Sequence, residues 1–188
     1  MWLAGTALNS TVGHDGFDSG GWSGGRGGHR GSAHAELAET YRGLMPDAFL
    51  DRMTSGEMQA RRKAGWAQTI TQAAEVVCVV VLEGEVVAFA SAGEARDHPG
   101  MAAELFTLYS LNRVQGRGVG RALLHAVLRE VRARGADSAA CWVLDVNPAR
   151  AWYARQGAHE AGGKVQAIPG GELREVRMVW PDLGALLD

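Results

Sequence analysis

The chain has few cysteines and no long apolar run, and these absences argue against a disulfide-linked protein, a thiolate metal site and a membrane-spanning helix. Its two cysteines, Cys78 and Cys141, each lie inside an apolar, strand-like stretch. We therefore expect two buried thiols rather than a disulfide, and the count is too low for a thiolate metal site. The longest wholly apolar run is Val76–Leu82, which is far shorter than the roughly 20 residues of a membrane-spanning helix. That run predicts a buried strand.

The sequence also lacks a charge excess, a paired histidine motif and a leader-like start. The net charge is -2 over 188 residues, so we expect no nucleic-acid-binding surface. The six histidines are scattered and form no HExxH pair, so no metal is expected. Because no basic stretch followed by an apolar one opens the chain, we expect a cytoplasmic protein without a membrane partner.

Residues 1–31 differ in composition from the rest of the chain. They hold ten of the 26 glycines and show neither a strand nor a helix period, and such a segment buries too little to offset its ordering entropy. We expect a flexible or irregular segment there, and a single domain over residues 32–188. Helical patterns begin at Ser32 and at Thr54–Glu57, which has the spacing of a capping box.

The chain beyond residue 74 alternates between strand and helix patterns. The β-branched runs Glu75–Leu82 and Val86–Ala92 predict a hairpin, and Ala103–Leu111 predicts a third antiparallel strand. Apolar residues at helical spacing predict a helix over 118–134, which Gly135 ends. The later expected elements are a strand at 138–144, a helix from Asn147 to Gly157 and a hairpin of residues 158–167 and 172–180.

A glycine-rich loop joins the third expected strand to the long helix, and the chain is organised around it. Alternate glycines at 116, 118 and 120 let successive backbone N–H groups turn inward into an anion-binding nest, which the helix N-terminus extends. The first turn of a helix favours acidic side chains, yet arginines surround this one, so a bound phosphate would supply the missing negative charge. The alternative is a structural turn with solvated arginines. The arginines are Arg113, Arg117 and Arg121.

Two common phosphate-binding motifs do not fit this loop. A Walker A motif ends in Gly-Lys-Ser/Thr, whereas the chain has Gly120-Arg121-Ala122. A Rossmann fingerprint needs glycine at its sixth position, where Arg121 stands, and it opens a parallel βαβ unit rather than following antiparallel strands. A Rossmann-like nucleotide enzyme is therefore a disfavoured alternative.

The loop and its flanking segments resemble the GCN5-related N-acetyltransferase (GNAT) family. The family's acetyl-CoA loop reads Gln/Arg-x-x-Gly-x-Gly/Ala, and Gln115–Gly120 matches it throughout. The likeness extends upstream over Glu104–Leu111 and downstream over Asn147–Gly157, which is similar to the family's Asn-x-x-Ala-x-x-x-Tyr-x-x-x-Gly pattern. It covers residues 75–180. The departure is in residues 1–31, where the family's first β-strand has no recognisable counterpart.

The resemblance implies an α+β fold, with a mixed, mostly antiparallel sheet of about six to seven strands flanked by helices and with splayed central strands. It also implies acetyl-CoA as the acyl donor and no metal. The pyrophosphate would sit on the loop N–H groups, and the pantetheine in the cleft between strands 104–111 and 138–144. Asn147 would hold the pantetheine or the far side of the cofactor. The expected cofactor-binding residues are Leu111, Arg113, Val114, Gln115, Gly116, Arg117, Gly118, Val119, Gly120, Arg121, Asn147 and Tyr153.

The implied activity is transfer of an acetyl group to a primary amine of a small molecule or protein. We expect a backbone N–H at the bulged end of the strand near Leu111 to steady the oxyanion. Tyr153 is the expected acid for the leaving thiolate, because a phenol stays protonated at neutral pH. Glu104, at the start of the cleft strand, is the expected acceptor of the amine proton. The alternatives are a packing role for Tyr153 and a solvated edge carboxylate at Glu104.

Larger questions stay open at this point. A catalytically inactive acyl-CoA-binding sensor or regulatory module is the alternative to an enzyme. The sequence does not distinguish an antibiotic, a polyamine, an amino acid or a protein N-terminus as the acceptor. It is also compatible with a homodimer.

Overall fold

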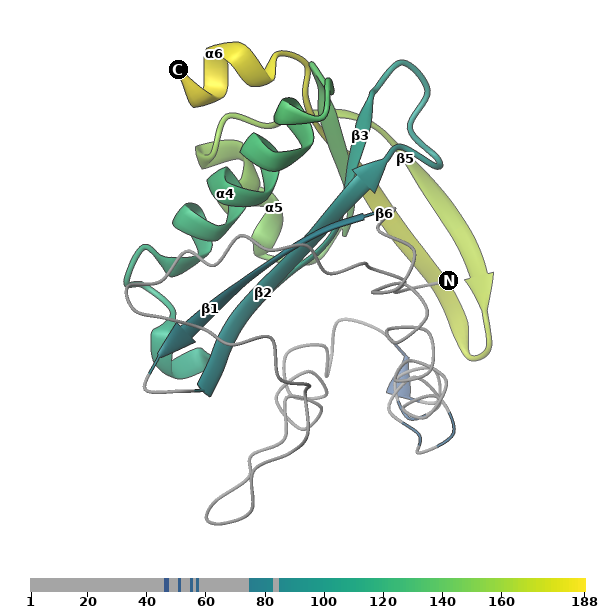
Figure 1. Cartoon of the computed structure of the whole chain (residues 1–188). Helices are drawn as coiled ribbons and strands as arrows, with labels where there is room; N and C mark the ends of the chain where they lie inside the picture. Colours follow the sequence, from purple (N-terminus) through teal and green to yellow (C-terminus); the bar gives the residue numbers. More distant parts are fainter. Residues whose placement is uncertain (1–45, 48–50, 52–54, 56, 58–74, 83–84) are drawn as a thin grey trace.

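The computed structural model describes residues 46–47, 51, 55, 57, 75–82 and 85–188 (Figure 1). The expected glycine-rich segment 1–31, its boundary at residue 32 and nearly all of the expected helices up to residue 67 lie outside these residues. The described chain contains a six-stranded sheet in the order β1-β2-β3-β4-β6-β5. The mixed α+β fold expected from the sequence is confirmed.

The strands are β1 (Glu75–Leu82), β2 (Glu85–Glu94), β3 (Ala103–Ser110), β4 (Ala139–Leu144), β5 (His159–Ile168) and β6 (Gly171–Trp180). The helices are α4 (Val119–Ala133), α5 (Ala149–Arg155) and α6 (Leu183–Leu187), and the 3₁₀ turn η1 covers Asn112–Val114. Every element expected between residues 75 and 180 is present, with small differences at its ends. The sequence analysis missed α6.

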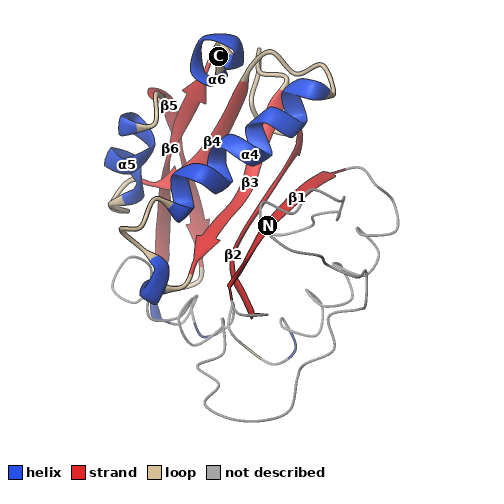
Figure 2. Cartoon of the chain, turned by 60° about the vertical axis from the view of Figure 1, so that its left-hand side comes forward, coloured by secondary structure: helices blue, strands red, loops and turns tan. Residues whose placement is uncertain are grey.

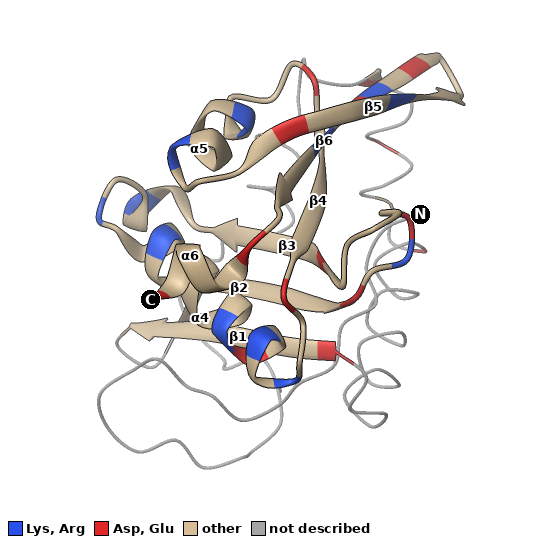
Figure 3. Ribbon diagram, turned by 90° about the horizontal axis from the view of Figure 1, so that it is seen from above, with Lys and Arg blue, Asp and Glu red and all other residues tan. Residues whose placement is uncertain are grey.

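The core lies between one face of the sheet and the helices α4 and α5, which cover that same face (Figure 2). Alternate residues of β1 and β2, such as Val76, Cys78 and Ala90, point into this core and are fully buried. The helical spacing of the apolar residues in α4 places its buried side chains on the side that faces the sheet. Arginines recur along the same helix (Figure 3). The buried residues of α4 are Leu123, Leu124, Ala126, Val127, Leu128 and Val131.

The central strands β3 and β4 separate soon after they begin. They pair in parallel only at Ala103 with Ala139 and at Glu104 with Ala140. By contrast, the β2–β3 ladder continues to Ser110 and the β4–β6 ladder continues to Leu144. Among the described residues, the edge of β3 beyond Glu104 that faces β4 therefore has no partner strand. The expected splay is confirmed: β3 and β4 are paired near Glu104 and diverge beyond it.

Both cysteines are buried free thiols, as expected. Burial, with a smaller contribution from the charge of Glu104, raises the pKa of the Cys141 thiol. Within the described ranges, no helix is long and apolar enough to cross a membrane. The same residues contain no group of three or more His, Cys, Asp or Glu side chains that could hold a metal ion.

Candidate active site

The loop after β3 is anchored by apolar side chains. Leu111 and Val114 are buried together with Val87 of β2. The N–H of Leu111 donates to the carbonyl of Val87 at 2.9 Å, and the carbonyl of Leu111 accepts from the N–H of Val114 at 3.0 Å. Because its N–H already has an acceptor, Leu111 does not offer the oxyanion donor that we expected there.

The bulge in β3 also lies elsewhere than expected. Ser91 of β2 opposes Thr107, whereas the next residue, Ala92, opposes Leu105. Phe106 is therefore the extra residue, in the middle of β3 rather than at its end near Leu111. A purely sequence-based analysis could not locate it, because a bulge is defined by the register with the neighbouring strand.

The glycines of the loop serve two different purposes. Gly116 has φ 73° and Gly118 has φ 80°, a region that strains other residues, although a Cβ at either position would meet nothing within 4 Å. A Cβ on Gly120, by contrast, would stand 3.4 Å from the ring of Trp152 in α5. Gly116 and Gly118 therefore shape the backbone in open space, whereas a Cβ on Gly120 would make an ordinary contact with Trp152.

The side chain of Gln115 links two parts of the loop through hydrogen bonds. Its side-chain Nε2 donates to Ser110 O at 3.3 Å and to Asn112 Oδ1 at 3.1 Å. Its backbone N–H donates to Asn112 O at 3.1 Å, so it is not part of the expected anion nest. These hydrogen bonds join the end of β3 to the start of the glycine turn.

The backbone N–H groups from Gly116 to Arg121 donate to no acceptor within the part of the chain that the structure describes. The first helical bond after the loop runs from Ala122 N–H to Gly118 O at 3.0 Å. Residues 116–118 and Arg121 are exposed, Val119 and Gly120 are half-buried, and all lie at the positive end of the α4 dipole. The backbone donors that the expected anion site needs are therefore unengaged.

The charge around these N–H groups is positive. The first turn of α4 contains no acidic residue, and Arg117 and Arg121 are exposed and form no ion pair with any described residue. Burial lowers the pKa of His125, and the charges of Arg121 and Arg129 lower it further. The residues present thus fit a phosphate group.

Asn147 stands at the start of α5, where its side chain caps the helix. Its Oδ1 accepts from the N–H of Ala149 at 2.8 Å, and its own N–H donates to Leu144 O at 2.9 Å. Beside it lies an open hollow of about 480 Å³. The hollow is lined by Asp145, Val146, Asn147, Pro148, Arg150, Ala151, Ala154 and Glu160.

Tyr153 is 9% exposed, and its ring belongs to the core. The ring meets Trp180 edge-on, with centroids 5.7 Å apart, and Trp152 at 5.1 Å. Trp180 is itself fixed by donation from its Nε1 to Gln156 O at 3.0 Å. These contacts give the ring a packing role, and a chemical role would belong to the hydroxyl group at its end.

Glu104 lies at the last residue pair of β3 with β4, and its side chain is only 15% exposed, so it is not the solvated edge carboxylate of the alternative interpretation. Its Oε2 accepts from the backbone N–H of Arg96 at 3.1 Å, and its Oε1 is 3.7 Å from His98 Nε2. Burial raises the pKa of Glu104, but His98 and Arg96 outweigh burial and hold the pKa below its ordinary value. His98 is buried and stacks on Trp142 at 5.1 Å.

A second carboxylate, on Glu75, lies on the same sheet face and was missed by the sequence analysis. Glu75 pairs with Gly93, which in turn pairs with Glu104, so the two acids share one row across three strands. Burial, with a further contribution from Glu104, raises the pKa of Glu75 from 4.5 to about 7, although Arg96 opposes the shift. The sequence did contain a signal for this residue, because Glu75 is an acidic residue at the start of an otherwise apolar strand.

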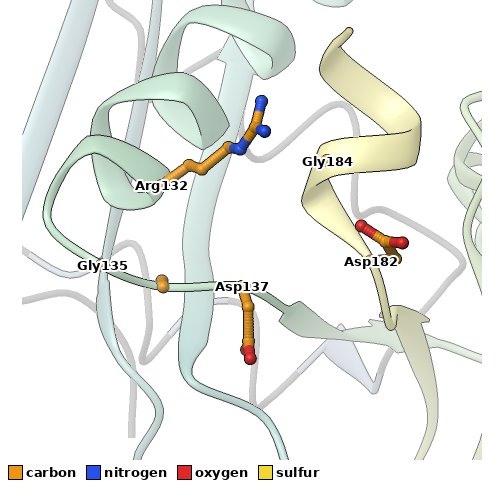
Figure 4. Close-up of a pocket in the computed structure, with 6 residues that line it drawn as sticks. Arg132, Gly135, Asp137, Asp182 and Gly184 are labelled. Carbon is orange, nitrogen blue, oxygen red and sulfur yellow. The ribbon is translucent and has the colours of Figure 1, made fainter.

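Another hollow, of about 310 Å³, lies at the C-terminal end of α4 (Figure 4). Its walls come from Arg132 at the end of the helix, from the loop around Asp137 and from the region of Asp182. Because α4 has 15 residues, this hollow is roughly 22 Å along the helix from the glycine loop. Arg132 is paired there with Asp188 at 2.7 Å, and the hollow is not part of the candidate site.

Comparisons with known proteins agree with this arrangement. The sequence model of the Acetyltransferase (GNAT) family matches residues 37–158. The uncharacterized N-acetyltransferase YuaI of Bacillus subtilis (strain 168) is 30% identical over 148 residues, which span 78% of this chain and 82% of YuaI.

Solved structures share the fold. A ribosomal-protein-alanine N-acetyltransferase from Brucella melitensis superposes with a TM-score of 0.56 at 25% identity, covering 80% of this chain and 97% of that one. The yncA protein of Salmonella typhimurium, solved with its cofactor acetyl-CoA, gives a TM-score of 0.54 at 21% identity, covering 79% and 87%. With its splayed sheet, its glycine loop and its match to the family model, the chain belongs to the GNAT family of N-acetyltransferases.

Proposed function

We propose that the protein transfers an acetyl group from acetyl-CoA to a primary amine of a small molecule or peptide, and that the glycine loop holds the cofactor's pyrophosphate. The observation that carries the proposal is the run of unengaged N–H groups from Gly116 to Arg121, set among arginines without an acidic residue. Such a surface stabilises an anion through hydrogen bonds and through the helix dipole.

The acetyl-CoA thioester supplies the activated acetyl group. The unpaired edge of β3 beyond Glu104 supplies backbone donors and acceptors that suit the amide groups of pantetheine. Asn147 belongs to the proposed cofactor surface through the hollow beside it, while its Oδ1 stays committed to capping α5. Acetyl-CoA is the cofactor named for yncA, and we extend it to this chain.

Three side chains have proposed roles, and two of them transfer protons. Tyr153 is the proposed acid for the leaving thiolate, because a phenol ordinarily keeps its proton at neutral pH. Glu104 is ionised at neutral pH because its pKa is held low, so it is better suited to attract a cation than to keep a proton. Glu75, with a pKa of about 7, is matched to accept a proton from an ammonium group. An oxyanion donor is proposed among the other N–H groups on the unpaired edge of β3, since that of Leu111 is engaged.

An acceptor screen with detection of free thiol tests the proposal. The protein is mixed with acetyl-CoA and a panel of amines that includes amino acids, polyamines, aminoglycosides and peptides with free N-termini. Release of CoA thiol that depends on one class of amine is the expected result. Tight acetyl-CoA binding without thiol release across the whole panel would favour a sensor instead, and binding of NAD in place of CoA would contradict the proposal.

A further inference from the structure

A site with the features of a cation receptor lies on the sheet face opposite α4, near the point where β3 and β4 are still paired. Its walls are the carboxylates of Glu75 and Glu104 and the ring of Phe106. Gly93 lies between the two acids in the register of β1, β2 and β3. Because glycine has no side chain, nothing from β2 separates the two carboxylates in this row.

Arg96 of the chain itself occupies this site. Its Nη2 is 3.8 Å from Glu75 Oε1, and its Nε is 3.8 Å from Glu104 Oε2. The guanidinium carbon lies 3.6 Å from the centroid of the Phe106 ring. Two carboxylates and an aromatic face form an environment that stabilises a positive charge, whatever molecule carries that charge.

The guanidinium of Arg96 is held loosely. Its side chain is 53% exposed, and both contacts with carboxylates are longer than a hydrogen bond. A guanidinium can donate five hydrogen bonds, yet this one donates none within the described ranges. The loop is held independently, because the backbone N–H of Arg96 donates to Glu104 Oε2 at 3.1 Å. The side chain can therefore leave the site without displacing its own backbone.

The carboxylate of Glu75 is incompletely satisfied even with Arg96 in place. Glu75 is 8% exposed, and its Oε2 is buried without a hydrogen-bond partner among the described residues. In the adjacent row of the same face, the hydroxyls of Ser91 and Thr107 are also buried without a partner in that part of the chain. Buried acceptors in this condition are costly. A primary ammonium, with three N–H donors on a compact centre, would satisfy the Glu75 carboxylate better than a planar guanidinium.

We propose that Glu75, Glu104 and Phe106 form the subsite for the cationic amine of the acceptor, and that Arg96 is its displaceable internal occupant. Naming this cation as the acyl acceptor rests on the proposed function, whereas the existence of the cation site does not. The substrate class that fits is an unbranched primary alkylamine, since the site offers charge and one aromatic face. An anionic or neutral acceptor would gain nothing from it.

The same geometry accounts for deprotonation of the amine. An N–H bond of the bound ammonium breaks, its proton forms an O–H bond with the Glu75 carboxylate, and the electron pair stays on nitrogen as the nucleophilic lone pair. The proton later leaves Glu75 for solvent. The charged groups that face Glu75 in the described part of the chain are Arg96 from the β2–β3 loop and Glu104 from β3. Burial and Glu104 raise the pKa of Glu75, Arg96 lowers it, and the result is a pKa of about 7.

The test uses butylamine as the probe, titrated into the full-length protein without cofactor and followed by protein NMR at pH 7.5. Butan-1-ol is the neutral control. Arg96→Ala should bind butylamine at least about threefold more tightly than the unmodified protein, because the internal competitor is gone. Glu75→Gln should lose butylamine binding. Arg174→Ala is the matched control, since it removes an exposed arginine whose partner is Glu172, and it should bind butylamine like the unmodified protein.

Equal or weaker butylamine binding by Arg96→Ala would overturn the cation site, and so would unchanged binding by Glu75→Gln. Arg96 is half-exposed, so its variant is expected to fold and carries the test even if Glu75→Gln does not. CoA affinity is measured in parallel on every variant. Normal CoA binding without butylamine binding would contradict this inference alone, whereas butylamine binding without CoA binding would contradict the proposed function alone.

Discussion

Trp152 of α5 lies against Gly120 in the first turn of α4, so closely that a Cβ at position 120 would stand 3.4 Å from Cζ2 of the indole. A Cβ at this distance makes an ordinary van der Waals contact, so packing does not require glycine at position 120. Gly118, by contrast, is explained by its φ of 80°. The two glycines match one cofactor-loop pattern but have different conformational requirements.

Alanine substitutions separate these requirements. Gly118→Ala should destabilise the protein by about 1 kcal/mol or more, because alanine is strained at positive φ. Gly120→Ala should leave the free energy of unfolding unchanged or raise it by up to about 1 kcal/mol, because a Cβ there makes an ordinary van der Waals contact and alanine favours helix. Denaturant unfolding measures both values, and equal losses in the two variants would contradict this account.

Charge reversal at the loop tests its role as an anion site. Arg117→Glu combined with Arg121→Glu should weaken CoA binding by at least about tenfold, while the fold without cofactor stays intact because acids suit a helix N-terminus. The control is Arg129→Glu with Arg134→Glu, which changes the net charge equally but away from the glycine loop, in the second half of α4 and at its C-cap. Calorimetric titration with CoA gives the affinities. Equal affinities in both double variants would exclude a specific role for the loop arginines.

The strands, the long helix and the loop could be predicted because their signals are local. β1 is a run of valines, α4 shows a 3.6-residue period, and Gly116 and Gly118 have the positive φ that glycine tolerates. The short helix α6 also had a local signal that was overlooked, since the side chain of Asp182 caps it by accepting from the N–H of Ala185 at 3.0 Å.

The pair of acids Glu75 and Glu104 could not be predicted, because the two residues share a row only through strand register. They flank Gly93 because each lies opposite it, in neighbouring ladders. The bulge at Phe106 likewise depends on the β2–β3 pairing. The engagement of the Leu111 N–H with Val87 follows from the same ladder. A sequence indicates the alternation of each strand but not which residues of different strands share a row.

Replacing Tyr153 with phenylalanine separates acid catalysis from packing. The ring contacts with Trp152 and Trp180 are kept, so the melting temperature and the acetyl-CoA affinity should change little. If the hydroxyl is the acid, turnover should fall by roughly 10² to 10⁴-fold where chemistry limits the rate, and the high-pH limb of the rate profile should disappear. Normal turnover of Tyr153→Phe on the true acceptor would mean that water or another group protonates the thiolate.

The raised pKa of Glu75 makes stability depend on pH. Between pH 4.5 and about 7 the folded protein keeps a proton on Glu75 that the unfolded chain has lost. The free energy of unfolding attributable to Glu75 should therefore fall as pH rises through this window, by at most about 3 kcal/mol. Glu75→Gln should flatten this part of the profile when denaturant unfolding is measured from pH 4 to pH 8. An unchanged slope in the variant would show that Glu75 titrates normally.

The central claim is that the backbone N–H groups from Gly116 to Arg121 bind the pyrophosphate of acetyl-CoA, and amide NMR during a CoA titration tests it most directly. Pantetheine, which lacks the pyrophosphate, is titrated as the control. We expect the amide resonances from Gly116 to Arg121 to shift strongly with CoA and little with pantetheine. The amide resonance of Gln115 should shift less than these, because its N–H already donates to Asn112 O. CoA binding that leaves the Gly116–Arg121 amides unmoved would contradict the account.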